Sequence, residues 1–295
     1  MILPYLIDTL AYIGIFAILA ISLNLEVGFT NLINFGQVAF FAIGAYASAI
    51  LALNGVPFAA AFFAAILLAA LAGYLIAIPT LRLREDYFAI VTIAFGEILR
   101  LFFTNEVWLT NGTNGLSGIP QPLYTLFRGN YPAFYLSLIL LSLLICYLIS
   151  HRLVNSPFGR VLKAIREDDV AAQALGKDVF IFRTKILVVG SAMAGAAGSL
   201  FAHYITFIAP DMFLPMVTFS IWVMIVIGGR GNIMGSVVGA TLIQLFERGT
   251  RFMKDVVVLP IEPANLRMIV IGLLLILFVI YNPDGILKER KFRAE

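Results

Sequence analysis

Apolar residues gather in nine runs along the chain, separated by shorter polar segments. A helix that crosses a lipid bilayer needs about 20 mostly apolar residues, and several runs approach this length. The shorter runs predict tilted, broken or re-entrant helices inside a bundle, because unpaired backbone cannot face lipid. The pattern therefore predicts an all-α, polytopic membrane helix bundle of about eight to ten transmembrane helices. The runs are 5–23, 32–53, 57–78, 87–103, 133–150, 184–208, 213–228, 233–247 and 267–281.

The composition agrees with a protein that lies in a lipid bilayer. Hydrophobic residues fill 61% of the 295 positions and charged residues 13%, whereas a soluble domain is about half apolar and about a quarter charged. The single cysteine, Cys146, cannot form an internal disulfide, and no Cys/His spacing typical of a metal site is present. The net charge of +3 is small and its basic residues lie between apolar runs, which argues against nucleic acid as a partner. We expect no cofactor and no metal.

Basic residues predict how the bundle is oriented, because short loops rich in Lys and Arg stay in the cytoplasm. Segment 151–183 and the tail 282–295 are the most basic, and loop 79–86 carries Arg82 and Arg84. The long segment 104–132 contains Arg128 as its one basic residue. We therefore expect one transmembrane domain over 1–295, with 151–183 cytoplasmic and 104–132 periplasmic. Nine simple crossings place the N-terminus outside, and a re-entrant piece reverses this, so its side stays open.

Small residues recur at spacing four in two of the runs. Gly190, Ala194 and Gly198 form one series, and Gly231, Gly235 and Gly239 form the other. Such spacing allows helix backbones to approach each other closely within a membrane. The spacing predicts tight bundle packing, and sliding helices in a transporter need the same smooth faces.

A few polar side chains interrupt the apolar runs. Glu97 and Arg100 are three residues apart on one expected helix face, so we expect an ion pair that either clamps the bundle or lines a pathway. Asp8 is expected to be solvated near a helix end, and His203 to be interfacial. Discontinuous helices often line transport sites. The candidate pathway residues are Asn24, Asn31, Asn34, Gln37 and Glu97.

Segment 151–183 predicts two short capped helices. Ser156 and Pro157 are a favourable N-cap and first residue. An apolar stripe then follows at helical spacing, formed by Phe158, Val161, Leu162 and Ile165. A second helix is expected over 170–175, with acidic residues at its start and Gly176 as a left-handed cap. From spacing alone, this pair either docks on a partner protein or lies on the membrane surface.

The residues 156–176 resemble the cytoplasmic coupling loop of the permease subunits of branched-chain amino-acid ABC importers. The stretch reads SPFGRVLKAIREDDVAAQALG, and further similar stretches follow the family's order at 23–30, 36–46, 81–92, 110–120 and 228–240. The order resembles that of the M-type subunit. The resemblance implies that this loop sits in a groove of an ATP-hydrolysing subunit. The residues implied at this contact are Arg166, Glu167, Asp168, Asp169, Ala171, Ala174, Leu175 and Gly176.

The same resemblance implies a function and a set of partners. It implies import of leucine, isoleucine and valine across the bacterial inner membrane. The partners are a second permease of related fold, two cytoplasmic ATPases and a periplasmic binding protein. The chain has no GxxxxGK[ST] motif for nucleotide phosphates and no HExxH or GxSxG motif, so we expect no catalytic residues here. Three alternatives stay open: a permease for urea, amides or other amino acids, an ion-coupled secondary transporter, and a membrane scaffold without transport.

Overall fold

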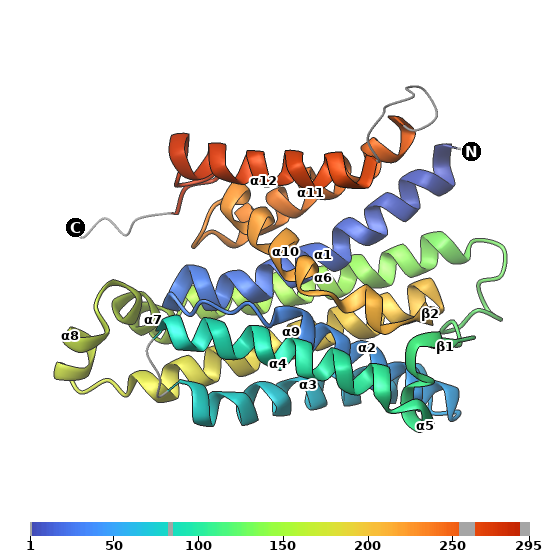
Figure 1. Cartoon of the computed structure of the whole chain (residues 1–295), viewed down its shortest axis with the longest axis horizontal. Helices are drawn as coiled ribbons and strands as arrows, with labels where there is room; N and C mark the ends of the chain where they lie inside the picture. The colour runs from blue at the N-terminus through green and yellow to red at the C-terminus, as the bar shows by residue number, and fades with distance from the viewer. Residues whose placement is uncertain (1, 82–84, 254–262, 290–295) are drawn as a thin grey trace.

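The computed structural model describes residues 2–81, 85–253 and 263–289 (Figure 1). Within these ranges, six helices are at least 18 residues long and apolar enough to span a membrane. The long helices are α1 (Ile2–Thr30), α2 (Gln37–Leu53), α3 (Phe58–Thr80), α4 (Glu85–Asn105), α6 (Tyr131–Asn155), α9 (Val179–Ile205), α10 (Pro215–Gly228), α11 (Ile233–Met253) and α12 (Pro263–Tyr281). Each of the nine predicted apolar runs contributes one of these helices. The prediction of an all-α polytopic bundle is confirmed.

A break in the helical backbone separates α1 from α2, as the polar residues at this boundary predict. Asn31 adopts a left-handed backbone conformation with φ of 53°, which ends α1 because few side chains tolerate this region. The chain then runs without helix until Gln37. The predicted run 32–53 is therefore shorter as a helix, and α1 extends seven residues beyond the predicted end at 23.

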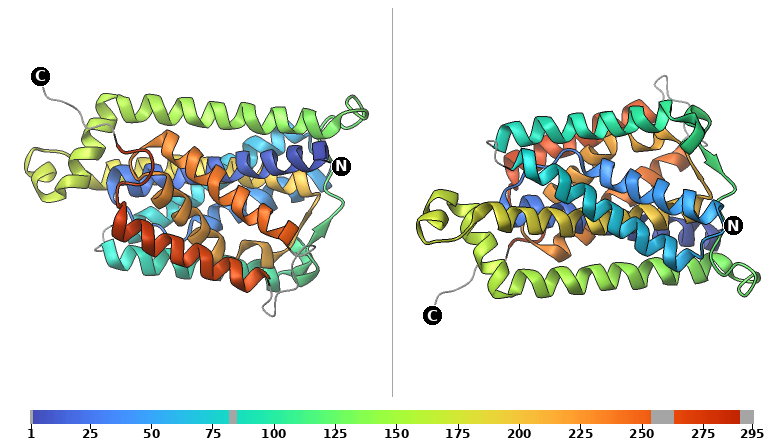
Figure 2. Two further views of the ribbon diagram at one scale, coloured as in Figure 1. Left: turned by 90° about the horizontal axis from the view of Figure 1, so that it is seen from above. Right: turned by 90° about the horizontal axis from the view of Figure 1, so that it is seen from below.

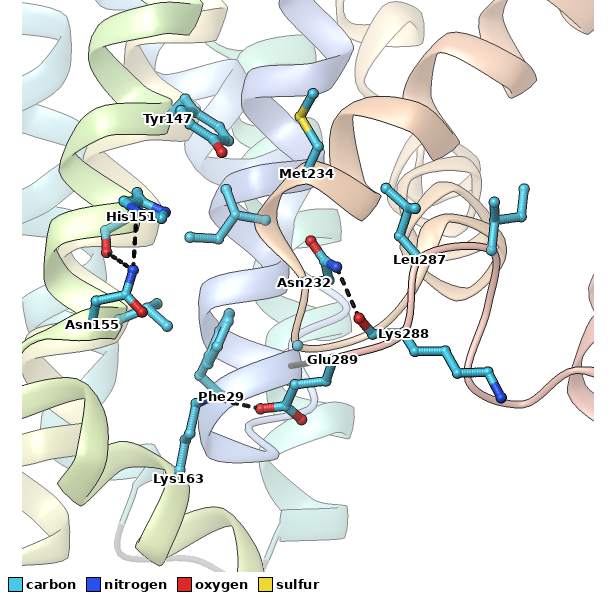
Figure 3. Close-up of a pocket in the computed structure, with 14 residues that line it drawn as sticks. Phe29, Tyr147, His151, Asn155, Lys163, Asn232, Met234, Leu287, Lys288 and Glu289 are labelled. Atoms are coloured by element: carbon cyan, nitrogen blue, oxygen red, sulfur yellow. Dashed lines mark hydrogen bonds and ion pairs between the residues drawn. The ribbon is translucent and has the colours of Figure 1, made fainter. Parts of the chain in front are cut away.

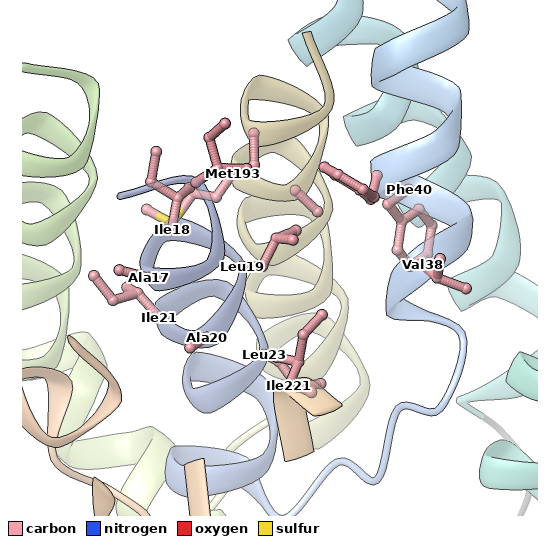
Figure 4. Close-up of a cluster of buried hydrophobic side chains, with 14 of the residues drawn as sticks. Ala17, Ile18, Leu19, Ala20, Ile21, Leu23, Val38, Phe40, Met193 and Ile221 are labelled. Carbon is pink, nitrogen blue, oxygen red and sulfur yellow. The ribbon is translucent and has the colours of Figure 1, made fainter. Parts of the chain in front are cut away.

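Helix α1 passes through the middle of the bundle and is buried on all sides over most of its length (Figures 1 and 4). Its side chains pack against α6, α9, α10 and α11. A helix that is apolar around its whole circumference is typical of such a central position. Figure 4 shows Leu19 and Leu23 facing neighbouring helices together with Val38, Met193 and Ile221.

Glycines bring two pairs of helices into close contact. In α2 and α9, a Cβ atom on Gly44 would meet the backbone of Gly195, and one on Gly198 would meet the carbonyl of Phe41. In the same way, Gly235 and Gly239 of α11 lie against the end of α10. These contacts confirm the packing that the spacing predicts, except that Gly231 lies in the turn before α11 with φ of 74°.

The two ends of the bundle carry different structures (Figure 1). One end holds the N-terminus, α5 (Val107–Thr110), the 3-10 helix η1 (Gly112–Asn114) and the antiparallel strands β1 (Leu116–Ser117) and β2 (Phe207–Ile208), which η2 (Pro210–Phe213) follows. The other holds α7 (Pro157–Glu167), α8 (Asp169–Ala174) and the end of α12. The N-terminus therefore shares an end with 104–132, as nine crossings require. Arg82, Arg84 and the last residues of the basic tail, 290–295, lie outside the described residues.

Two polar residues near this N-terminal end make contacts within the protein that the sequence did not predict. Asp8 is solvated as expected, with its side chain 42% exposed, but it also accepts a hydrogen bond from the Tyr204 hydroxyl at 2.7 Å and pairs with Arg248. His203, two residues before the end of α9, is fully buried within the protein. Its Nδ1 lies 2.7 Å from the Pro120 carbonyl oxygen, which can only accept a hydrogen bond, so Nε2 accepts one from Ser48 at 2.9 Å. Both contacts join segments that are distant in the sequence.

Candidate coupling surface and buried polar cluster

Helix α7 forms where the sequence predicts it and is anchored by its apolar stripe. The Ser156 hydroxyl caps the helix by accepting a hydrogen bond from the Gly159 amide at 3.4 Å. Leu162 and Ile165 are buried, and Phe158 stacks on Phe182 of α9 with ring centroids 5.1 Å apart. The stripe therefore fixes α7 against the bundle rather than leaving it free.

Helix α8 spans Asp169–Ala174, one residue earlier at each end than the predicted 170–175. The reason is the cap: the Asp168 carboxylate accepts a hydrogen bond from the Ala171 amide at 2.9 Å. Gly176 has the left-handed conformation that the sequence predicts, with φ of 75°. Among the helix residues, Ala172 is buried, in a small core with Ile165 and Val179.

The rest of α8 presents an exposed surface at the tip of the molecule (Figure 1). Val170 is 71% exposed and Leu175 is 80% exposed, and Ala171 and Ala174 lie beside them on the exposed side. We call these four residues the α8 face. A rigid helix that shows apolar and small side chains to solvent is typical of a protein-binding site.

The acidic residues before α8 are engaged within the chain. Glu167 accepts hydrogen bonds from Arg166, at 2.8 Å from Nη2, and Asp169 pairs with Arg183 at 3.5 Å. With Asp168 used as the cap, the three carboxylates offer less free charge than the sequence suggests. Each of the three carboxylates therefore has a partner within this chain.

Arg166 joins α7 to two distant parts of the molecule. Its Nη1 donates to the Gly28 carbonyl oxygen of α1 at 2.7 Å and to Glu289 Oε2 at 2.8 Å. Lys163 pairs with the other oxygen of Glu289 at 2.9 Å. Burial lowers the pKa of Arg166, but its hydrogen bonds to Glu167 and Glu289 outweigh this and raise the pKa above its usual value. Arg166 therefore stays charged, and its bonds are charge-assisted.

A cavity of about 870 Å³ adjoins this link (Figure 3). It lies between α6, the end of α1, the start of α11 and the C-terminal segment. The tail is held here by hydrogen bonds from the Ile286 and Leu287 amides to the end of α10, both 2.9 Å long. The labelled side chains in Figure 3 include Tyr147, His151, Asn155, Lys163 and Asn232.

Three of the candidate pathway residues are buried and lie in two separate places. Asn24 is in one, and Asn34 and Gln37 are together in the other. Asn24 bonds to the turn before α11, accepting from the Gly231 amide at 3.0 Å and donating to Ser236 at 2.7 Å. Asn34 donates to Gln37 Oε1 at 3.1 Å, and its own oxygen accepts from the Gly36 amide. Of these side chains, Asn34 satisfies backbone at the helix break, through the Gly36 amide, whereas Asn24 bonds to the region around the start of α11. Asn31 lies apart, partly exposed, with Arg230 nearby at 3.5 Å.

Glu26 is a buried carboxylate that the sequence analysis missed. It is fully buried, its Oε2 accepts from Asn34 at 2.7 Å, and its Oε1 has no hydrogen-bond partner among the described residues. Gly190 of α9 makes room for it, since a Cβ there would collide with Oε1. The candidate pathway residues included Glu97 as their one carboxylate, and Glu26 was not among them. The sequence did hold one indication that Glu26 is buried. It lies within the largely apolar stretch 23–29, two residues after Asn24.

Glu97 and Arg100 form the predicted pair on α4. Arg100 binds the carboxylate with two hydrogen bonds, 3.0 Å from Nε and 2.5 Å from Nη2. The side chains are 40% and 23% exposed, for Glu97 and Arg100 respectively. The pair is therefore local to one helix and does not reach the buried cluster around Asn34.

A family model described as "Branched-chain amino acid transport system / permease component" matches residues 5–279. The chain belongs to this family. The permease is 33% identical to the Escherichia coli (strain K12) high-affinity branched-chain amino acid transport system permease protein LivM, over 95% of this chain and 69% of that protein. It is 28% identical to a probable LivM of Methanocaldococcus jannaschii, over 95% and 92% of the two chains. It is also 26% identical to LivH of Salmonella typhimurium, over 79% and 80%.

A solved structure, described as an inward-facing conformation of a metal-chelate type ABC transporter, shares the fold. It is similar with a TM-score of 0.50 over 94% of this chain and 87% of the other, at 16% identity. The permease is thus a multi-pass membrane subunit of an ABC importer, of the LivM type, and its family consists of transport permeases rather than enzymes. Its relatives of LivM and LivH type support the pairing of two permeases within such a transporter.

Proposed function

We propose that this permease moves leucine, isoleucine and valine across a bacterial inner membrane, as part of an importer with four kinds of subunit. The others are a second permease of related fold, two ATP-hydrolysing subunits and a periplasmic binding protein. The observation that carries this proposal is the α8 face, a capped helix that shows Val170 and Leu175 to solvent at the tip of the molecule. The family supplies the substrate class.

The end that carries α7 and α8 is placed in the cytoplasm, and the end with 104–132 in the periplasm. The basic residues of 151–183 support this orientation, since they favour the cytoplasmic side. The ATPases then bind below α8, and the binding protein docks at the end that holds β1 and β2. ATP hydrolysis belongs to the partners, and this chain contributes the pathway.

Two contacts support a route from the ATPases into the bundle. The core of Ile165, Ala172 and Val179 joins α7, α8 and the start of α9, so these elements move together. Arg166 connects the same unit to the Gly28 carbonyl, two residues after Glu26 on α1. A movement of α8 is therefore passed to the helix that carries the buried polar groups.

A second candidate is an ion-coupled transporter, which the buried Glu26 favours. Such transporters use intramembrane carboxylates as ion or proton sites, and one oxygen of Glu26 has no partner in the part of the chain that the structure describes. The LivM-type relatives and the exposed α8 face favour the ABC importer instead, because an ion-coupled transporter has no use for a docking helix at its tip.

Transport by the purified assembly distinguishes these functions. We expect proteoliposomes that contain both permeases, the ATPases and the binding protein to accumulate radiolabelled leucine only when ATP is present. Urea and acetamide at equal concentration should not compete. Uptake driven by a proton or sodium gradient without ATP would establish the ion-coupled alternative, and ATP-driven uptake of urea but not leucine would establish the other permease class.

A further inference from the structure

Two long helices lie at opposite edges of the bundle and differ in what they show to their surroundings. Figure 2 places α6 along one side and α4, with α12, along the other in both views. The outward side of α6 is apolar, with Leu140, Leu141, Leu144, Ile145, Leu148 and Ile149 all exposed. That surface suits contact with lipid chains.

The outward side of α4 is different because it holds an ion pair. Ile90, Glu97 and Leu101 follow at spacings of seven and four, so Glu97 lies in the middle of an exposed helical stripe. Ile90 is 62% exposed and Leu101 is 45% exposed. We call this stripe, with Arg100 beside it, the α4 face.

The position of the pair along α4 prevents it from reaching water at either end of the span. The membrane-spanning part of α4 runs from Tyr87 to Asn105, so Glu97 is about 12–15 Å from both ends at 1.5 Å per residue. Arg100 does not extend toward the nearer end, because two hydrogen bonds hold its guanidinium against Glu97, one turn deeper. Ionised side chains at this depth almost always face protein or a water-filled cavity rather than lipid.

We propose that the α4 face is the contact surface for the second permease subunit, whereas α6 faces lipid. The inference rests on the proposed function, since it needs a partner within the membrane. The soluble ATPases and binding protein cannot reach the middle of a span, which leaves a membrane subunit as the occupant. The partner should present polar groups opposite Glu97 and Arg100, because charged groups at an interface need complementary partners.

A site-specific photo-cross-link tests this surface in the complete importer. The photoreactive residue p-benzoylphenylalanine would replace Ile90 on the α4 face, and, as the matched control, Leu141 on α6, which is 54% exposed. We expect a covalent product with the second permease from position 90 and none from position 141. A product from position 141, or no product from position 90, overturns the assignment.

Co-purification and leucine import by the wild-type complex show whether a negative result concerns the α4 face alone or the proposed function as a whole. If no second permease co-purifies with the wild-type chain, the proposed function fails. If the wild-type complex forms and imports leucine but the cross-link comes from α6, then only the assignment of the surface fails. As a second readout, Glu97→Gln leaves Arg100 uncompensated and should lower co-purified second permease at least threefold. The double change with Arg100→Gln should restore part of it, and unchanged recovery in Glu97→Gln contradicts the proposal.

Discussion

Ala174→Arg is expected to abolish both ATPase binding and ATP-driven uptake while the permease itself inserts and folds normally. Ala174 is exposed on the α8 face, between Val170 and Leu175, and makes no contribution to the bundle core. If α8 docks on the ATPase as proposed, the new guanidinium would lie buried and unpaired at that contact. Such a charge costs about 3 kcal/mol or more, which corresponds to about a hundredfold in affinity. Co-purified ATPase per permease is the measurement.

Gln173→Arg is the matched control for this change. It adds the same side chain to the same helix, and residue 173 points away from the α8 face because successive residues turn by about 100°. Gln173 is also exposed, so neither variant disturbs the core. Full ATPase recovery with Gln173→Arg and loss with Ala174→Arg would fit the account. Normal recovery and uptake with Ala174→Arg would mean that α8 lies elsewhere, for example on the membrane surface.

Gly198→Leu is expected to prevent folding of the bundle. A Cβ at this position would collide with the Phe41 carbonyl and lie 2.7 Å from the Ala45 amide nitrogen. Both atoms belong to the backbone of α2, so no side-chain rotation relieves the contact and the two helices must separate. Overpacking of a dense core costs about 1–3 kcal/mol or more, and here it acts along a whole helix pair. We expect at least a tenfold loss of folded protein.

Gly272→Leu provides the comparison, because no atom of the described residues lies within 4 Å of a Cβ at this helical glycine. Folding is followed through Cys146, which is buried and reacts with a thiol dye once the bundle opens. In Gly198→Leu, Cys146 should react with the dye before any heating. In Gly272→Leu, it should become reactive at the same temperature as in the wild type. Equal melting curves for all three would contradict the close packing of α2 and α9.

Much of the architecture follows from local sequence patterns. Runs of about 20 apolar residues are set by the bilayer, so each predicted run becomes a helix. The capped helices α7 and α8 are equally local, since Ser156, Asp168 and Gly176 act on backbone groups within a few residues. The one-residue shift of α8 arises because Asp168 rather than a later residue caps it.

Features that depend on distant segments could not be read from the sequence. The pairing of Asp8 with Arg248 and Tyr204, and the burial of His203 beneath Pro120, require three-dimensional contact between helices. The position of Glu26 in an apolar stretch is visible in the sequence, but its burial is not, because it depends on the space that Gly190 leaves on another helix. The spacing of apolar residues shows which side of a helix is buried, but it does not show which other helix packs against that side.

A cysteine cross-link from Leu175 tests the central claim most directly. Leu175→Cys, in a Cys146→Ala background, places a single thiol on the α8 face, and a heterobifunctional maleimide–diazirine reagent can then capture whatever protein lies against it. The account predicts one product, formed with the ATPase subunit in the assembled importer and diminished when the ATPase is omitted. Capture of lipid alone, with the ATPase present and active, would contradict it.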